Sequence, residues 1–413
     1  MKPSKVVVIG QGYVGLPLAI AIAEAGHEVI GFDLNEELAN RLNLGLSHIE
    51  DVSSSTLKGL ISKLKYKASS NPSDFAESDI AIIAVPTPLN ENREPDVSYV
   101  VSASELLGKN LSKRTLIINE STSYPGTLRD VIVKNVEKNS QPGVKHLYAI
   151  SPERVDPGNP NWKIKNTPRL FSGLTPEAGA KTKDFYSTFC DQIIELSSPE
   201  AAETAKLFEN TFRQVNIALV NEFSLICGRL GINVHEVLNG AATKPYGFMK
   251  FSPGIGVGGH CIPVDPSFLS FAANRAGAEA KFIDLANEVN FEMPKKIIEE
   301  ISRKRNETIS GKKILIIGIS YKPNIADIRE SPTLRLIEEL RNLGNEVIWH
   351  DSLVKTWGTE SSVDLNNISN TDFVIVSILH DAIDRQSLIN SRVDIYDLTG
   401  EFMVSMVFNK DYQ

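Results

Sequence analysis

Short runs of consecutive apolar residues alternate, in the N-terminal part of the chain, with stretches in which apolar residues recur every three or four positions. Five such runs lie at residues 5–9, 28–33, 80–85, 116–119 and 147–150. The run at 5–9 is a continuous β-branched run after its first residue, which is typical of a strand buried on both faces of a parallel sheet. The stretch 16–25 has helical spacing and ends at Gly26, near a helix C-cap. Strands that alternate with helices predict an α/β fold with a doubly wound sheet.

The middle of the chain follows a helical period instead. Residues 201–230 keep apolar positions at helical spacing without a proline, which predicts a long spine helix on which two domains or two subunits pack. Further helices are predicted at 266–276 and 283–303. The α/β pattern then returns, with a strand at 313–318 and a helix at 332–343.

Two segments near the C-terminus resemble segments near the N-terminus. Residues 26–33 and 344–351 agree at five of eight positions, and 78–82 resembles 371–375. Matches this short indicate shared architecture, because all such units follow one pattern. We therefore predict two Rossmann-like domains joined by a helical central domain, with boundaries at 1–198, 199–305 and 306–413.

The composition narrows the function classes. The chain has 413 residues, 42% of them hydrophobic, and a net charge of −8, which argues against nucleic acid and anionic membranes as partners. No apolar run reaches the ~18–20 residues of a membrane span, and we expect no signal peptide. Three scattered cysteines without a CxxC motif argue against disulfides and a cysteine-rich zinc site, and fit the cytoplasm.

A dinucleotide fingerprint, Gly10-x-Gly12-x-x-Gly15, lies between the first strand and the first helix. Gly10 permits the tight turn, Gly12 admits a pyrophosphate, and Gly15 lets helix and strand pack closely. The helix N-terminus offers N–H groups to phosphates. Asp33 ends the second strand, where an acid accepts hydrogen bonds from ribose, and no arginine stands at 34–37. The motif favours NAD over NADP; the alternative is a glycine-rich turn without a ligand.

One cysteine stands at the end of a glycine-rich segment, Gly256-Val257-Gly258-Gly259-His260-Cys261. Glycines allow close approach of a ligand, and a thiol there can serve as a nucleophile. The alternative is an inert buried thiol. We expect no metal at His260-Cys261, because adjacent residues seldom reach one ion and no partner lies at ligand spacing.

Several other polar residues are candidates for chemistry. Lys206 and Asn210 lie one turn apart on the spine helix, where the lysine could stabilise charge or simply be solvated. Glu153, Thr122 and Thr87 follow predicted strands, at the sheet edge where α/β proteins bind ligands; turn and capping roles are the alternative.

The strand predicted at 313–318 ends in a single glycine, Gly318, whereas the dinucleotide fingerprint needs three glycines. We therefore expect no second dinucleotide there. Tyr321, Lys322, Asp327 and Arg329 could hold a nucleotide by stacking and charge, or form structural salt bridges.

Together these motifs resemble the nucleotide-sugar 6-dehydrogenases, the family of UDP-glucose and UDP-N-acetylhexosamine dehydrogenases, over nearly the whole chain. The resemblance rests on the fingerprint and on Val85-Pro86-Thr87-Pro88, Glu120-Ser121-Thr122, Ser151-Pro152-Glu153-Arg154, Lys206-x-x-x-Asn210, Gly258-Gly259-His260-Cys261-x-x-x-Asp265, Tyr321-Lys322-Pro323 and Arg329-Glu330-Ser331.

The resemblance implies a four-electron oxidation. A sugar C6 alcohol loses a hydride to NAD⁺, the Cys261 thiolate attacks the aldehyde, a second NAD⁺ takes a hydride from the thiohemiacetal, and water hydrolyses the thioester. Lys206 and Asn210 would stabilise oxyanions, and Asp265 would position or activate water with help from Glu153 and Thr122.

The resemblance also assigns binding residues and domain roles. The cofactor would contact Gly10, Gly12, Tyr13, Val14, Gly15, Asp33, Thr87 and Thr122. The UDP-sugar would contact Glu153, Arg154, Lys206, Asn210, Phe251, Gly258, Tyr321, Lys322 and Arg329. Residues 1–198 would bind NAD, 199–305 would carry the cysteine loop and the contact of a homodimer or larger oligomer, and 306–413 would bind the nucleotide-sugar.

The segments 88–96, 151–159 and 259–265 look most like enzymes of UDP-N-acetylglucosamine, while Lys322-Pro323-Asn324-Ile325 is shared with UDP-N-acetylmannosamine enzymes; UDP-glucose is a further alternative. Asp397-Leu398-Thr399-Gly400 departs from the family's Asp-Thr-Arg-Asn and lacks its arginine. Outside this reaction, a two-electron hydroxyacid dehydrogenase and a non-catalytic NAD sensor stay open, the first because it also carries Lys-x-x-x-Asn after a Rossmann domain.

Overall fold

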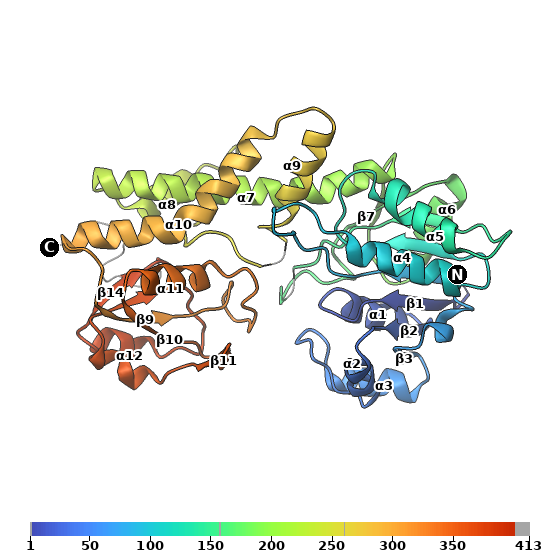
Figure 1. Ribbon diagram of the computed structural model, residues 1–413, viewed down its shortest axis with the longest axis horizontal. Coiled ribbons are helices and arrows are strands. Elements are labelled where there is room, and N and C mark those ends of the chain that lie inside the picture. The colour runs from blue at the N-terminus through green and yellow to red at the C-terminus, as the bar shows by residue number, and fades with distance from the viewer. Residues whose placement is uncertain (1, 157, 260, 401–413) are drawn as a thin grey trace. The chain divides into compact units, whose positions relative to one another are not determined.

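A computed structural model describes residues 2–156, 158–259 and 261–400 (Figure 1). The chain divides into two compact units. Unit 1 runs to Glu209 and includes Phe271–Ala278; unit 2 consists of Asn210–Ser270 and the chain from Glu279 onward.

Unit 1 is built on an eight-stranded sheet in the order β3-β2-β1-β4-β5-β6-β7-β8. Its strands are β1 Lys5–Ile9, β2 Glu28–Phe32, β3 Tyr66–Ser69, β4 Ile80–Ile83, β5 Leu116–Asn119, β6 Leu147–Ile150, β7 Arg169–Gly173 and β8 Ile193–Glu195. Neighbouring strands are parallel except β6 and β7, which run antiparallel. The five strands expected from apolar runs are confirmed within two residues at each end.

The α-helices of unit 1 follow its strands in sequence. They are α1 Gly15–Glu24, α2 Glu36–Asn43, α3 Ser54–Ser62, α4 Ser98–Asn110, α5 Lys134–Asn139 and α6 Pro176–Tyr186, and a π-helical turn at Leu128–Val133 precedes α5. Asn35, Ser53 and Thr175 accept backbone N–H groups as N-caps of α2, α3 and α6.

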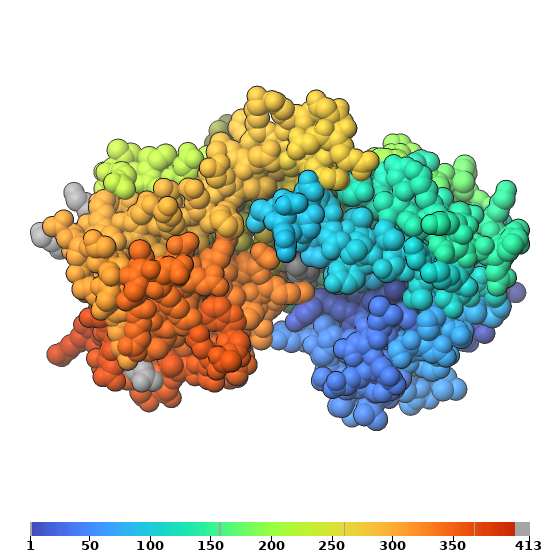
Figure 2. Space-filling model, viewed as in Figure 1, coloured from blue at the N-terminus to red at the C-terminus, as the bar shows by residue number. Residues whose placement is uncertain are grey.

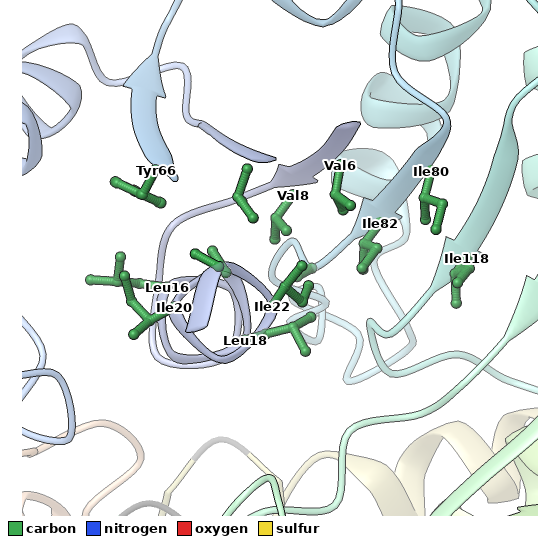
Figure 3. Packing of buried hydrophobic residues seen from close by; sticks show 14 of the residues in the cluster. Val6, Val8, Leu16, Leu18, Ile20, Ile22, Tyr66, Ile80, Ile82 and Ile118 are labelled. Atoms are coloured by element: carbon green, nitrogen blue, oxygen red, sulfur yellow. The ribbon is translucent and has the colours of Figure 1, made fainter. Parts of the chain in front are cut away.

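Helix α1 packs its apolar side chains against the strands of the same sheet, as Figure 3 shows. The labelled residues of this core are Val6, Val8, Leu16, Leu18, Ile20, Ile22, Tyr66, Ile80, Ile82 and Ile118. A Cβ on Gly15 would lie 1.8 Å from the Gly10 carbonyl oxygen, so the helix needs a glycine to come this close to the loop. The expected role of Gly15 in helix packing is what the backbone geometry requires.

Unit 2 combines long helices with a smaller parallel sheet. The helices are α7 Pro199–Leu230, whose first eleven residues belong to unit 1, α8 Val234–Ala242, α9 Asp265–Arg275, whose last five residues belong to unit 1, α10 Lys281–Arg305, α11 Pro332–Asn342 and α12 Arg385–Asn390. The strands are β9 Lys313–Ile317, β10 Glu346–His350, β13 Phe373–Val376 and β14 Asp394–Asp397, with a small hairpin of β11 Thr356–Trp357 and β12 Glu360–Ser361. The expected spine helix is α7, drawn in green in Figure 1.

The sheet of unit 2 repeats part of the sheet of unit 1. Its order β10-β9-β13-β14 corresponds to β2-β1-β4-β5. The Gly10 N–H donates to the Phe32 carbonyl at 2.8 Å, and the Gly318 N–H donates to the His350 carbonyl at 2.8 Å. Both glycines have positive φ, 93° and 79°. The similarity of the two sequence segments therefore reflects shared architecture, as expected.

The space-filling view shows closely packed side chains in the N-terminal region, in blue, and in the C-terminal sheet region, in red (Figure 2). In the described part of the chain, no helix has the length and apolar character needed to cross a membrane.

Candidate active site

The nucleotide fingerprint forms a tight loop between β1 and α1. The Asp33 carboxylate accepts the Gln11 N–H at 2.9 Å and the Asn35 N–H at 3.0 Å, which ties the loop to the end of β2. A Cβ on Gly10 would lie 2.4 Å from the Ala84 carbonyl oxygen, whereas a Cβ on Gly12 would meet nothing within 4 Å. The open space at Gly12 fits a pyrophosphate that approaches the backbone there. The residues present therefore suit NAD.

Asp33→Ala is expected to raise the Kd for NAD⁺ roughly 10- to 100-fold, because a hydrogen bond to a charged group contributes about 1.5–3 kcal/mol and 1.4 kcal/mol is a factor of ten. Isothermal titration calorimetry measures the change. Asp184→Ala removes an exposed carboxylate from α6 of the same unit and serves as the matched control. Unchanged affinity of Asp33→Ala would contradict a ribose-facing role of this acid.

The segment after β5 ties together two neighbouring elements through consecutive hydroxyl groups. Ser121 Oγ accepts the Val85 N–H and donates to the Val85 carbonyl, both at 2.9 Å, so it holds the loop after β4. Thr122 Oγ1 accepts a hydrogen bond from Lys206 Nζ. Lys206 is 7% exposed, which excludes the alternative of a solvated surface lysine.

Glu203 was not predicted from the sequence and holds α7 against this segment. Its buried carboxylate accepts the Gly126 N–H at 2.7 Å, the Leu128 N–H at 3.1 Å and the Ser123 hydroxyl at 3.1 Å. Burial raises the pKa of Glu203 to about 7, although these donors oppose the rise. Glu203 stands three residues before Lys206, so it anchors the turn of α7 that presents the lysine to Thr122. The sequence signal that could have identified Glu203 is an acidic residue on the apolar face of the predicted spine helix.

Glu153 follows β6 and is held by fixed donors. Its carboxylate accepts the N–H groups of Arg154 and Val155, both at 2.7 Å, and a guanidinium N–H of Arg169 at 2.8 Å. Burial raises the pKa of Glu153, but Arg169 and the backbone donors outweigh it, so the net pKa is lowered. Arg154 forms a two-pronged pair with Glu209 at 2.6 and 2.9 Å. Glu153 is therefore a fixed carboxylate, and the Arg154 guanidinium already has a partner within unit 1.

Cys261 lies in unit 2, four residues before the start of α9. Its carbonyl accepts the N–H of Asp265 at 2.8 Å, and the buried Asp265 carboxylate accepts an N–H from Asn210 Nδ2 at 2.7 Å. Cys261 is half-buried, whereas Cys190 and Cys227 are buried. Burial raises the pKa of Cys190 to about 11 and raises that of Cys227 as well. Of these three thiols, Cys261 is the one suited to meet a substrate.

The glycines before Cys261 pack against another segment of the same unit, and the sequence did not reveal this contact. A Cβ on Gly258 would lie 2.6 Å from Cβ of Tyr321, and one on Gly259 would lie 2.8 Å from its ring. The Gly259 N–H donates to the Arg329 carbonyl at 3.0 Å. These glycines allow close approach, as expected, but the group that approaches is Tyr321. The cysteine loop is thereby attached to the segment that follows β9.

That segment is itself rigidly supported. The Arg329 guanidinium pairs with the Asp327 carboxylate at 2.5–3.0 Å. Asn324 adopts φ 61° and donates its N–H to His380 Nδ1 at 2.9 Å. His380 Nε2 faces Asp351, the counterpart of Asp33, at 3.1 Å. Asp351 is fully buried, so this position has no exposed oxygen for a ribose.

The remaining predicted residues are placed as follows. Tyr13 is 37% exposed, and Val14 packs at the edge of the unit 1 core. Thr87 is half-buried in the loop after β4. In unit 2, the Phe251 ring lies 6.0 Å from the ring of Phe212, and Lys322 is half-buried beside Tyr321.

The C-terminal departure from the family pattern also has a local structure. The Asp397 carboxylate accepts the N–H and hydroxyl of Thr399 at 2.8 and 2.7 Å. A Cβ on Gly400 would lie 2.4 Å from the His235 ring. Glycine at this position allows the chain to pack against α8.

No group of three or more His, Cys, Asp or Glu side chains suited to a metal ion occurs among residues 2–156, 158–259 and 261–400. The prediction of no metal at His260-Cys261 rests on ligand spacing. Of these two residues, His260 lies outside the described part of the chain.

Comparison with known families gives matches along most of the chain. Models of the UDP-glucose/GDP-mannose dehydrogenase family match residues 4–190 (NAD binding domain), 200–292 (central domain) and 315–399 (UDP binding domain).

Individual relatives agree with these matches. A UDP-N-acetyl-D-mannosamine dehydrogenase of Pyrococcus horikoshii is 35% identical, over 91% of this chain and 89% of its own. A UDP-N-acetyl-D-glucosamine 6-dehydrogenase of Pseudomonas aeruginosa is also 35% identical, over 84% and 82%. The solved structure of a UDP-D-ManNAc dehydrogenase from Pyrococcus horikoshii has a TM-score of 0.89 and 32% identity, and the match covers 99% of this chain and 100% of that chain.

Proposed function

Because the chain belongs to the UDP-glucose/GDP-mannose dehydrogenase family, and is an NAD-dependent UDP-sugar dehydrogenase, we propose that it oxidises the C6 alcohol of a UDP-N-acetylhexosamine to the carboxylate. The observation that carries the proposal is the setting of Cys261: a half-buried thiol whose neighbour Asp265 is buried and hydrogen-bonded to Asn210.

NAD⁺, when bound, accepts one hydride in each of two oxidations. The chain's own part begins after the first, when the Cys261 thiolate attacks the C6 aldehyde, forming a C–S bond and turning the carbonyl into an alkoxide. Loss of a hydride from this carbon gives a thioester, and water then displaces the thiolate and leaves the carboxylate. The balance is one alcohol, two NAD⁺ and one water giving one carboxylate, two NADH and three protons.

Lys206 and Asn210 supply the positive and polar groups for the oxyanions of these steps. Lys206 is already oriented by Thr122 and has two further N–H groups to donate. Asn210 gives one Nδ2 hydrogen to Asp265 and keeps its second. Pre-oriented donors of this kind stabilise developing negative charge without reorganisation.

Asp265 and Glu153 are the carboxylates for handling water. Asp265 is fully buried and begins α9, so its position is fixed by the helix and by Asn210. Glu153 is held ionised by its three donors. A carboxylate in a fixed place can orient a water and accept its proton.

We take UDP-N-acetylglucosamine as the substrate, because the segments 88–96, 151–159 and 259–265 resemble enzymes of that sugar. The experiment compares NADH release with UDP-N-acetylglucosamine, UDP-N-acetylmannosamine, UDP-N-acetylgalactosamine and UDP-glucose. Highest kcat/KM with UDP-N-acetylglucosamine supports the assignment. Preference for UDP-N-acetylmannosamine, the sugar named for the equally similar archaeal relative, would replace it. No turnover with any of the four would favour the NAD sensor.

We also propose that the protein forms a homodimer through α7. Exposed apolar side chains recur on this helix at intervals of four and seven residues, which keeps them in one narrow stripe. They are Phe208 (62% exposed), Phe212 (41%), Leu219 (63%), Ile226 (46%) and Leu230 (67%). In a homodimer, the stripe on the second copy of the chain would pack against these side chains and cover them.

Leu219→Glu is expected to convert the dimer to a monomer at micromolar concentration, because the contact would bury an unpaired charge on each copy. Light scattering measures the mass. Leu44→Glu, at a similarly exposed leucine next to α2 (68%), is the matched control. A monomeric wild-type protein would contradict the proposal.

A further inference from the structure

Two buried carboxylates of unit 1 share one guanidinium. Arg169, the first residue of β7, donates to Glu120 Oε1 at 2.8 Å and to Glu153 Oε2 at 2.8 Å. Tyr186, the last residue of α6, donates its hydroxyl to Glu120 Oε1. The backbone connects the acids as well, since the Glu153 N–H donates to the Glu120 carbonyl at 3.3 Å.

The cluster brings two carboxyl groups and one guanidinium together with little exposure to solvent. The side chains of Glu120, Arg169 and Glu153 are 0%, 4% and 10% exposed. Two ionised carboxylates and one guanidinium leave an excess buried charge, which is costly. One of the two acids is therefore expected to be protonated.

The donors decide which acid keeps the proton. Glu153 accepts two backbone N–H groups besides Arg169, all of which favour its ionised form. Glu120 Oε2 is buried without a hydrogen-bond partner among the described residues. Burial raises the pKa of Glu120 to about 7; the charge of Glu153 adds to the rise, and Arg169 and Tyr186 oppose it.

We propose that Glu120 is a positioning residue for the reaction, acting on Glu153 through Arg169. When Glu120 is protonated, the charge of Arg169 is neutralised by Glu153 alone. When Glu120 is ionised, Arg169 is shared between two carboxylates, and the added negative charge makes Glu153 a stronger base. Glu153 contacts the reacting water under the proposed function, on which this inference rests.

The direction of the pH effect follows from these charges. Below about pH 7 Glu120 holds its proton and Glu153 is the weaker base; above that pH Glu120 is ionised and Glu153 is the stronger base. The groups that face Glu120 are Arg169, Tyr186, Glu153 and the more distant Cys190 thiol, whose own raised pKa keeps it neutral in this range. Release of acid from the thioester is therefore expected to accelerate as pH rises through 7.

The first test is the rate of acid release in single-turnover experiments between about pH 6 and pH 8.5, with wild type and Glu120→Gln. Glutamine keeps the size of the side chain and fixes it as neutral. We expect Glu120→Gln to lose the rise and to stay roughly threefold to tenfold below the wild-type rate at high pH, with KM for both substrates unchanged. A pH profile that matches wild type would overturn the proposal.

The second test reads the proton directly and does not depend on turnover. The infrared difference spectrum between wild type and Glu120→Gln should contain the carbonyl band of a protonated carboxylic acid, which disappears as pH rises through 7. Tyr186→Phe removes a donor that favours the ionised form, so the band should persist to higher pH. Tyr148→Phe, which removes a buried hydroxyl bonded to Glu137, is the matched control and should leave the titration unchanged. If Glu120→Gln did not fold, a wild-type band whose titration is the same in Tyr186→Phe would overturn the proposal, and so would the absence of any protonated-acid band in the wild type below pH 7.

A Glu153→Gln variant distinguishes failure of this inference from failure of the role proposed for Glu153. If Glu153→Gln is inactive while Glu120→Gln follows the wild-type profile, the inference fails and the proposed function stands. If Glu153→Gln retains full activity, the role proposed for Glu153 fails, and the inference fails with it.

Discussion

Cys261→Ala is expected to abolish formation of the acid while the protein still binds NAD⁺. Without a thiol the C6 aldehyde has no nucleophile to make its carbon tetrahedral, and the second hydride cannot leave. Loss of a nucleophile lowers the rate of acid formation by roughly 10³-fold or more. The fingerprint loop, which we expect to bind the cofactor, lies in unit 1 and does not include Cys261. Mass spectrometry of the quenched reaction detects the acid.

The other two cysteines provide matched controls for this variant. Cys190→Ala and Cys227→Ala remove buried thiols, so each should alter stability but leave the ratio of acid to NADH unchanged. Cys261→Ser tests the same step with a poorer nucleophile and should also fail to release acid. Acid formation by Cys261→Ala at the wild-type rate would exclude a covalent role for Cys261.

Lys206→Ala is expected to lower kcat by about 10²- to 10³-fold with little change in the Kd for NAD⁺. The ammonium group is buried and oriented by Thr122, so its loss removes a charged donor from a position where water cannot replace it. Stopped-flow measurement of NADH formation gives the rate. Lys206→Arg keeps the charge but changes the shape of the donor, and should recover part of the activity.

Lys181→Ala, at an exposed lysine of α6, is the matched control for Lys206→Ala and should behave as wild type. A large increase in KM with unchanged kcat would instead show that Lys206 binds the substrate without stabilising the oxyanions.

The first sheet and the main helices could be predicted because their signals are local. The strands β1, β4, β5 and β6 are continuous apolar runs, and α7 and α10 keep a helical period over many residues. Strand β7 carries Arg169 and ends in a glycine, and β8 is a three-residue strand with an exposed glutamate. These strands form because neighbouring strands supply their hydrogen bonds, which a local pattern does not reveal.

The residues of the candidate site likewise include some that the sequence identifies and others that it does not. The fingerprint, Asp33, Lys206 and Cys261 are recognisable because each belongs to a motif of fixed spacing. Glu203 and Arg169 are not, because their partners are distant in sequence: Glu203 contacts Gly126 and Leu128, and Arg169 contacts Glu120. The packing of Tyr321 on Gly258 and Gly259 is hidden for the same reason. Fixed spacing identifies the candidate groups for the chemistry, whereas the groups that hold them depend on the fold.

The central proposal is that one enzyme performs both oxidations through Cys261. The direct measurement is the amount of NADH formed per UDP-N-acetylglucosamine consumed to completion, with the product identified by mass spectrometry. Two NADH and one carboxylate are expected for each sugar, and no acid is expected with Cys261→Ala. One NADH per sugar, with the aldehyde as the final product of the wild-type protein, would contradict the proposal.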